Sequence, residues 1–242
     1  MTKPSWQDFG TFDESAYPEL WDGVVGAWAP CLGPTGLRLH DHSRYSNWGT
    51  LTNMDPPTDW ILSDGQYALD FDGVNDCVLM GSQPSISAAF PRLTKSVWVR
   101  IRDTSALKYL FADFNGAGTL SRLSISHDTV FRAFQNTATS LASTTTIVTG
   151  QWYMVTVARN DGTGASNTGS IGLYVNGRLD ASATYSYSSP ALQASGEQLG
   201  RSNATFGDHP NAQIAEAQMW SRTLSANEIQ QLYLLGRGGM YE

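Results

Sequence analysis

Residues 170–182, SIGLYVNGRLDAS, constrain the fold of this chain more than any other segment. The apolar residues of SIGLYV recur at every second position, which is the period of a half-buried β-strand. Asn176 and Gly177 follow, and this pair supplies the two positive φ angles that a type I′ turn needs. The alternation resumes at Leu179 and Ala181. The segment therefore predicts a β-hairpin with a two-residue turn.

Short runs of the same kind fill most of the chain. Alternating or aliphatic runs separated by turns include SVWVRIR, KYLFADF, RLSISH, TVFRAF and QWYMVTVAR. One helix is predicted near the C-terminus, where Ser225 and Glu228 form a capping box. Leu224 and Ile229 form its hydrophobic staple, and Gly236 is its predicted end. Many strands with a single helix predict one all-β antiparallel sandwich and not an α/β enzyme fold.

The composition excludes several classes of protein. Hydrophobic residues make up 41% and charged residues 15% of the 242 residues, which suits a globular domain and not a disordered chain. The net charge of −7 excludes a general polyanion binder, because neutralising phosphates requires a basic surface. No window approaches the roughly 18–20 apolar residues that span a bilayer. The polar, acidic opening also lacks the apolar core of a secretory signal, so we expect a protein made in the cytoplasm that binds neither nucleic acid nor membrane.

The stretch 66–81, QYALDFDGVNDCVLMG, predicts a second strand–turn–strand unit with a candidate ion site at its bend. Asp70, Asp72 and Asp76 gather around this turn. Carboxylate, amide and carbonyl oxygens from one loop are the ligands that Ca²⁺ prefers, which makes Asp72, Asn75 and Asp76 the candidate ligands. Tight turns use the same residue types without any ion, so both interpretations stay open here.

Residues 1–22 show no regular period but are rich in aromatic residues. We expect an extended arm whose rings pack either on the body of the same chain or on a neighbouring protein. The candidate docking residues of this arm are Trp6, Phe9, Phe12, Tyr17 and Trp21.

Four further aromatic residues are candidates for stacking on sugar rings, because an exposed ring offers a flat amphipathic surface. Two of them alternate with serine in the segment TYSYSSP, although each ring could instead belong to the core. The four glycan-binding candidates are Trp48, Trp60, Tyr185 and Tyr187.

The sequence predicts no enzyme. Glucanases of sandwich architecture carry paired Glu residues on one strand, and no such pair occurs, since Glu216 is isolated in its run. The G-x-S-x-G and H-E-x-x-H patterns are also missing from the sequence. His40 and His42 could face one side of a strand, but no third zinc ligand lies near them in the sequence.

Several short segments follow one another in a characteristic order between about residues 23 and 235. They are VVGAW (24–28), DHSRYSNWGTL (41–51), ALDFDGVNDCV (68–78), SVWV (96–99), GQWYMVTV (150–157), LYVNG (173–177), LGR (199–201) and the run 214–229. Their order and spacing resemble the laminin-G-like, concanavalin-A-like jelly-roll family. The resemblance implies a binding or assembly module, of the kind found in virion proteins of tailed bacteriophages, and many such modules carry calcium.

The chain departs from this family pattern at two positions. Ala215 stands where the family has an Asp, and Cys77 stands where it has a Tyr. If that Asp holds an ion in the family, calcium here would depend on Asp72, Asn75, Asp76 and backbone carbonyls alone.

We therefore expect an arm (1–22), a jelly-roll domain (23–235) and a short tail (236–242). The expected function is that of a non-catalytic virion structural or decoration protein, which docks on capsid or tail subunits or on other copies of itself. The alternatives are a lectin-like module that binds polysaccharide and, more remotely, a carbohydrate-active enzyme. The expected location is the virion, with a cytoplasmic or non-classically released protein as the alternative.

Overall fold

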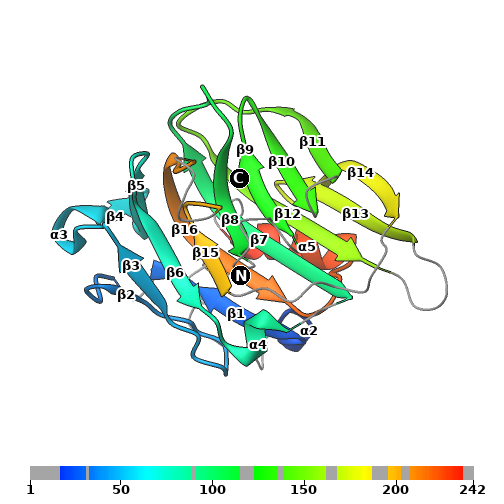
Figure 1. The fold of residues 1–242 in the computed structure, drawn as a ribbon, viewed down its shortest axis with the longest axis horizontal. Helices are drawn as coiled ribbons and strands as arrows, with labels where there is room; N and C mark the ends of the chain where they lie inside the picture. Colours follow the sequence, from blue (N-terminus) through cyan, green and yellow to red (C-terminus); the bar gives the residue numbers. More distant parts are fainter. Residues whose placement is uncertain are drawn as a thin grey trace, which may run out of the picture.

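The computed structural model describes residues 17–30, 33–88, 91–114, 123–135, 139–161, 168–186, 196–202 and 208–236. These residues form two antiparallel sheets of eight strands each, which are stacked as a sandwich (Figure 1). The predicted all-β antiparallel sandwich is therefore confirmed.

Sheet A contains the C-terminal strand β16 near its centre, and β1 pairs with β16 as well (Figure 1). Its strands in spatial order are β14 (Arg178–Ser186), β13 (Thr168–Val175), β12 (Trp152–Asn160), β7 (Arg92–Ile101), β16 (Asn211–Trp220), β5 (Gln66–Asp72) and β4 (Trp60–Ser63), with β1 (Val24–Trp28) beside β16.

Sheet B faces sheet A across the core. Its strands in spatial order are β11 (Thr139–Thr146), β10 (Val130–Gln135), β9 (Ser124–His127), β8 (Lys108–Phe114), β15 (Gly196–Leu199), β6 (Cys77–Gly81), β3 (Gly49–Thr52) and β2 (Arg38–Leu39).

The core between the sheets is built from one face of each strand. Val97, Val99 and Ile101 of β7 are fully buried there, together with Phe111 and Phe131 from sheet B. This is the alternation that the run SVWVRIR predicts, because successive side chains of a strand point to opposite faces.

The outer face of sheet A carries a second apolar cluster. Helix α5 (Ala226–Leu235) covers this face with Ile229 and Leu232, and Leu20 of the short helix α2 (Pro18–Trp21) belongs to the same cluster. Burying both faces of sheet A explains why β7, β12 and β16 are buried at nearly every position.

Two local predictions are confirmed in detail. Asn176 and Gly177 both have positive φ, 50° and 76°, as a type I′ turn requires. Helix α5 begins with the predicted capping box, in which Ser225 accepts the N–H of Glu228 while the Glu228 carboxylate accepts the N–H of Ser225.

Three one-turn helices were not predicted from the sequence. They are α2, α3 (Pro56–Asp59) and α4 (Pro84–Ser87), and each has Pro in its first turn. Proline suits that position because its fixed φ is helical and its missing N–H would have no partner there. None of the described helices is long and apolar enough to cross a membrane.

Candidate functional site

The loop 43–48, between β2 and β3, is held in place by the carboxylate of Asp41. This side chain is 5% exposed and accepts hydrogen bonds from the backbone N–H groups of Ala27, Ser43 and Asn47, at 2.8, 2.8 and 2.6 Å. The Ser43 hydroxyl donates a fourth bond at 2.7 Å. A buried carboxylate with this many donors fixes the backbone around it.

Asn47, near the C-terminal end of loop 43–48, forms hydrogen bonds with β1. Its side-chain amide donates to the backbone carbonyl of Val25 at 2.9 Å, and its backbone carbonyl accepts the indole N–H of Trp28 at 2.7 Å. Asp41, Ser43 and Asn47 of the segment DHSRYSNWGTL therefore form internal hydrogen bonds. The residues between Ser43 and Asn47 face outward.

The outward residues of loop 43–48 are aromatic and basic. Tyr45 is 41% exposed and Trp48 is 40% exposed. The guanidinium of Arg44 lies 5.1 Å from the centre of the Tyr45 ring, and that of Arg38 lies 5.0 Å from the Trp48 ring. The His40 ring is 4.9 Å from that of Trp48. Cation–π contacts of this kind hold the rings in defined orientations at the surface.

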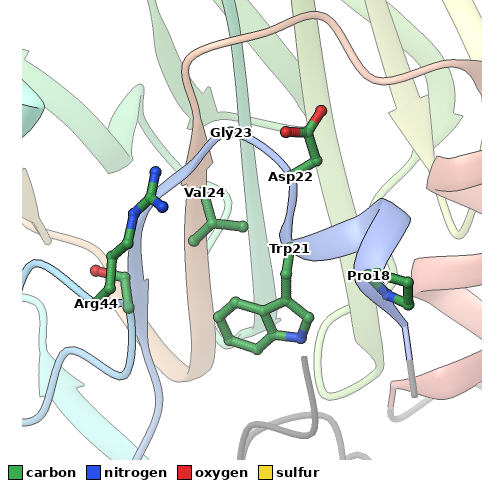
Figure 2. A pocket seen from close by; sticks show the side chains of 7 residues that line it. Pro18, Trp21, Asp22, Gly23, Val24 and Arg44 are labelled. Carbon is green, nitrogen blue, oxygen red and sulfur yellow. The ribbon is translucent and has the colours of Figure 1, made fainter. Parts of the chain in front are cut away.

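A small pocket lies between loop 43–48 and helix α2 (Figure 2). Its volume is about 230 Å³. Figure 2 shows Trp21 and Pro18 on the helix side and Arg44 opposite them, with Val24 between. The remaining lining residues are Asp22, Gly23 and Ser43. This volume is below the range of about 300–1,000 Å³ that drug-sized ligands occupy, so it suits a single ring or a short side chain.

The chemistry of the pocket is mixed. Trp21 is 8% exposed and offers an apolar wall. Asp22 carries an 80% exposed carboxylate at the rim, 3.6 Å from the guanidinium of Arg222. Arg44 is exposed and brings a positive charge to the opposite side. A ring wall, a guanidinium and a carboxylate around one hollow can bind a ligand that has both a flat face and polar groups.

The described glycan-binding candidates differ in their exposure. Trp48 is exposed, but Trp60 is 6% exposed and donates its indole N–H to the carbonyl of Gly36. Tyr185 is 7% exposed, and its hydroxyl donates to Asp161. The expectation that Trp60 and Tyr185 offer surface rings is therefore corrected. Tyr187 lies outside the described residues.

The residues of the arm fall into two groups. Tyr17 and Trp21 pack on the outer cluster of sheet A, against the body of the same chain. Trp6, Phe9 and Phe12 lie outside the described residues.

The 72–76 turn uses its carboxylates for local hydrogen bonds. Asp72 accepts the N–H of Val74 at 2.7 Å, and Asp76 accepts the N–H of Asp72 at 2.9 Å. Asn53 donates its amide to the carbonyl of Asn75 at 3.0 Å. Burial raises the pKa of Asp76 to about 6, since a buried carboxylate is costly to ionise. In the described ranges, no three His, Cys, Asp or Glu side chains gather where they could hold a metal ion.

One oxygen beside this turn was missed by the sequence analysis. Asn211 pairs with Asp72 across the β16–β5 ladder, and its Cβ lies near Gly73. Its side-chain oxygen is buried and has no hydrogen-bond partner in the part of the chain that the structure describes. No local pattern marks Asn211, which lies far from the turn in sequence and reaches it only through strand register.

A family model described as the concanavalin A-like lectin/glucanases superfamily matches residues 72–230. No curated protein matches the sequence. The structure is similar to Trypanosoma rangeli sialidase in complex with sialic acid, with a TM-score of 0.66 and 18% identity over 89% of this chain and 34% of that one. It is also similar to the receptor binding domain of botulinum neurotoxin type G, with a TM-score of 0.59 and 15% identity over 87% of this chain and 51% of that one. The chain thus spans between a third and about half of these proteins, and at such identities the likeness concerns the fold alone.

Proposed function

Because the chain belongs to the concanavalin A-like lectin/glucanases superfamily, we propose that it is a non-catalytic module that binds carbohydrate at loop 43–48. The observation that carries this proposal is that one rigid loop supplies both a wall of the α2 pocket, through Ser43 and Arg44, and two exposed rings, Tyr45 and Trp48. Rings for stacking and charged groups for hydrogen bonding are what a sugar-binding surface requires.

The charges around loop 43–48 favour an acidic glycan. Although the chain has a net charge of −7, the segment 38–44 contains Arg38 and Arg44. Asp41 faces inward, where its hydrogen bonds are used by the loop backbone. Burial lowers the pKa of His42, so this residue is uncharged at neutral pH. Guanidinium groups bind carboxylate and sulfate groups in a bidentate manner, which makes a sugar acid the best match.

The absence of catalysis is also part of the proposal. A glycosidase of the retaining kind needs two carboxyl groups about 5–5.5 Å apart on either side of an open cleft. Asp22 is the one carboxylate among the described residues that line the α2 pocket. Asp113 and Glu197 do lie opposite each other, but both side chains are fully buried and no substrate could reach them.

A glycan array of neutral and acidic polysaccharides tests the proposal. We expect the full chain to bind selectively to acidic glycans, and we expect Arg44→Ala and Trp48→Ala each to lower the affinity at least tenfold, since removing an interface anchor costs roughly 1–2 kcal/mol or more. Arg178→Ala and Leu62→Ala are matched controls, because they remove an exposed Arg and an exposed apolar residue elsewhere. Binding that both site variants leave unchanged would exclude loop 43–48.

A second candidate function is assembly, as a virion decoration protein that docks through the arm. The supporting observation is that Leu20 and Trp21 are buried on sheet A, which fixes the described end of the arm beside the α2 pocket. Deleting residues 1–16 should abolish co-purification with a particle or with other copies while the melting temperature stays the same. Unchanged assembly after the deletion would rule out docking by the arm.

A further inference from the structure

Three charged side chains meet in the core between the two sheets. None of them lines the α2 pocket. They are Lys95 of β7, Asp113 of β8 and Glu197 of β15, and the exposed fraction of each side chain is 0%. Lys, Asp and Glu are almost never fully buried unless they are paired. The proposed carbohydrate site makes no use of this cluster.

Strand register brings the three groups together. Lys95 lies two positions before Val97 on the inward face of β7, so its side chain enters the core. Asp113 and Glu197 are direct cross-strand partners in sheet B. The Lys95 Nζ atom lies 2.6 Å from Glu197 Oε2 and 3.7 Å from Asp113 Oδ1.

The surroundings hold the lysine in this position. Lys95 Nζ also donates to the carbonyl of Leu123 at 2.7 Å, and it lies 4.8 Å from the centre of the Phe111 ring. The backbone N–H of Leu123 donates to Asp113 Oδ1 at 3.2 Å. Leu123 thus contacts both the amine and the carboxyl group and fixes their separation.

The arrangement is costly as long as all three groups are charged. Removing charges from water is unfavourable, and two carboxylates directly opposite each other on a ladder repel. Lys95 neutralises one of the two negative charges, so that one remains within the triad. A reaction that converts Lys95 and Asp113 into a neutral amide would remove one opposite pair of buried charges, and the triad would keep the single negative charge that it already carries.

We propose that Lys95 and Asp113 form an intramolecular isopeptide bond, with Glu197 carrying protons between them. Nζ attacks Asp113 Cγ, the Nζ–Cγ bond forms, and one Cγ–Oδ bond breaks. Two of the three ammonium protons pass by way of Glu197 to the departing oxygen, which leaves as water. Glu197 ends in its starting state, one positive and one negative charge disappear, and no oxidant or other reactant is needed.

The geometry places the attacking nitrogen beside the carboxyl group that it would attack. Reacting atoms in productive conformers are about 3–3.5 Å apart, and a fixed pair of this kind reacts with a very high effective concentration. Lys95 Nζ is 3.7 Å from an oxygen bonded to the Asp113 carbon that it would attack, and Glu197 is within hydrogen-bonding distance of the same nitrogen. The product would join β7 of sheet A covalently to β8 of sheet B.

Intact mass spectrometry of the denatured full chain tests this inference without any variant. We expect a mass lower than that of the sequence by one water, and digestion should release a branched peptide that joins Lys95 to Asp113. The full sequence mass in correctly folded protein, shown by its circular dichroism spectrum, would overturn the inference. A lost water that maps to a cyclic imide at Asp113, with no branched peptide, would overturn it as well.

Three variants assign the roles of the triad. Lys95→Arg should keep its full mass, because a guanidinium does not lose its proton in proteins and cannot attack. Glu197→Gln should keep its full mass because the proton carrier is gone. Asp113→Asn should lose ammonia instead of water and so give a product with the same mass as the cross-linked wild type. Equal loss of water from the Lys95→Arg variant would contradict the assignment.

Discussion

Asp41 shows how a single buried carboxylate determines what a neighbouring surface can present. It accepts three backbone N–H groups and one hydroxyl, and these bonds order loop 43–48 before any ligand arrives. Ordering a loop in advance lowers the entropy that binding must otherwise offset. Arg44, Tyr45 and Trp48 are thus surface groups with an internal support.

The first prediction concerns this support. Asp41→Ala leaves three backbone donors without their acceptor, and each buried unsatisfied group costs roughly 1–3 kcal/mol. We expect the free energy of unfolding, measured by urea denaturation, to fall by about 3 kcal/mol. Asp22→Ala removes an 80% exposed carboxylate nearby and should change it by less than about 0.5 kcal/mol. Equal effects of the two substitutions would contradict the role of Asp41.

His127 gives the fold a specific sensitivity to acid. The residue is fully buried, and burial lowers its pKa from the ordinary 6.5 to about 4. Between pH 6.5 and 4, His127 binds a proton more readily in the unfolded chain than in the folded one. The stability contributed by neutral His127 is therefore fully present above pH 6.5 and is lost as the pH falls toward 4.

His127→Gln should therefore flatten the fall in unfolding free energy between about pH 6.5 and 4, because glutamine does not titrate. Asp76, whose raised pKa acts in the opposite direction, is present in both proteins and cancels in the comparison. Ser124→Ala is the control, because it removes another fully buried polar group of β9 that does not titrate, and it should keep the wild-type slope. A His127→Gln profile parallel to that of the wild type would contradict the prediction.

Individual elements show what the sequence could and could not predict. The β13–β14 hairpin is as expected at its turn, but a register shift at Leu173/Tyr174 breaks the alternation after it. Leu179 pairs with Tyr174 on the turn side of this shift and is 55% exposed, whereas Tyr185 lies beyond the shift and is buried, contrary to expectation. A bulge depends on how two strands pair, and one strand's pattern does not reveal it. The alternation in β7 also predicts that Lys95 faces inward, because it lies two positions before Val97 on the same strand.

The 72–76 turn is the element on which the calcium prediction depends. Its own hydrogen bonds account for the carboxylates of Asp72 and Asp76 without an ion, while the buried side-chain oxygen of Asn211 beside the turn has no partner among the described residues. We expect Ca²⁺ to raise the melting temperature relative to chelator-treated protein, and Asp76→Asn to reduce that difference. A chelator that leaves the melting temperature unchanged would favour the turn without an ion.

The sandwich itself was predictable because alternation, turn residues and helix caps all agree with it. The candidate site was only partly predictable. Trp48 was recognised as a surface ring, but the α2 pocket requires a one-turn helix and loop 43–48 to meet, and they are not neighbours in sequence. The buried triad likewise combines three strands of two sheets, so only the folded chain brings it together.

We propose that loop 43–48 binds acidic carbohydrate through the charge of Arg44. Isothermal titration calorimetry of the full chain with an acidic polysaccharide from the array, and with the same polysaccharide after chemical reduction of its carboxyl groups, tests it most directly. We predict that reduction of the glycan abolishes binding and that Arg44→Ala weakens it at least tenfold, which corresponds to about 1.4 kcal/mol. Equal affinity for the acidic and the reduced polysaccharide, or for the wild type and Arg44→Ala, would contradict it.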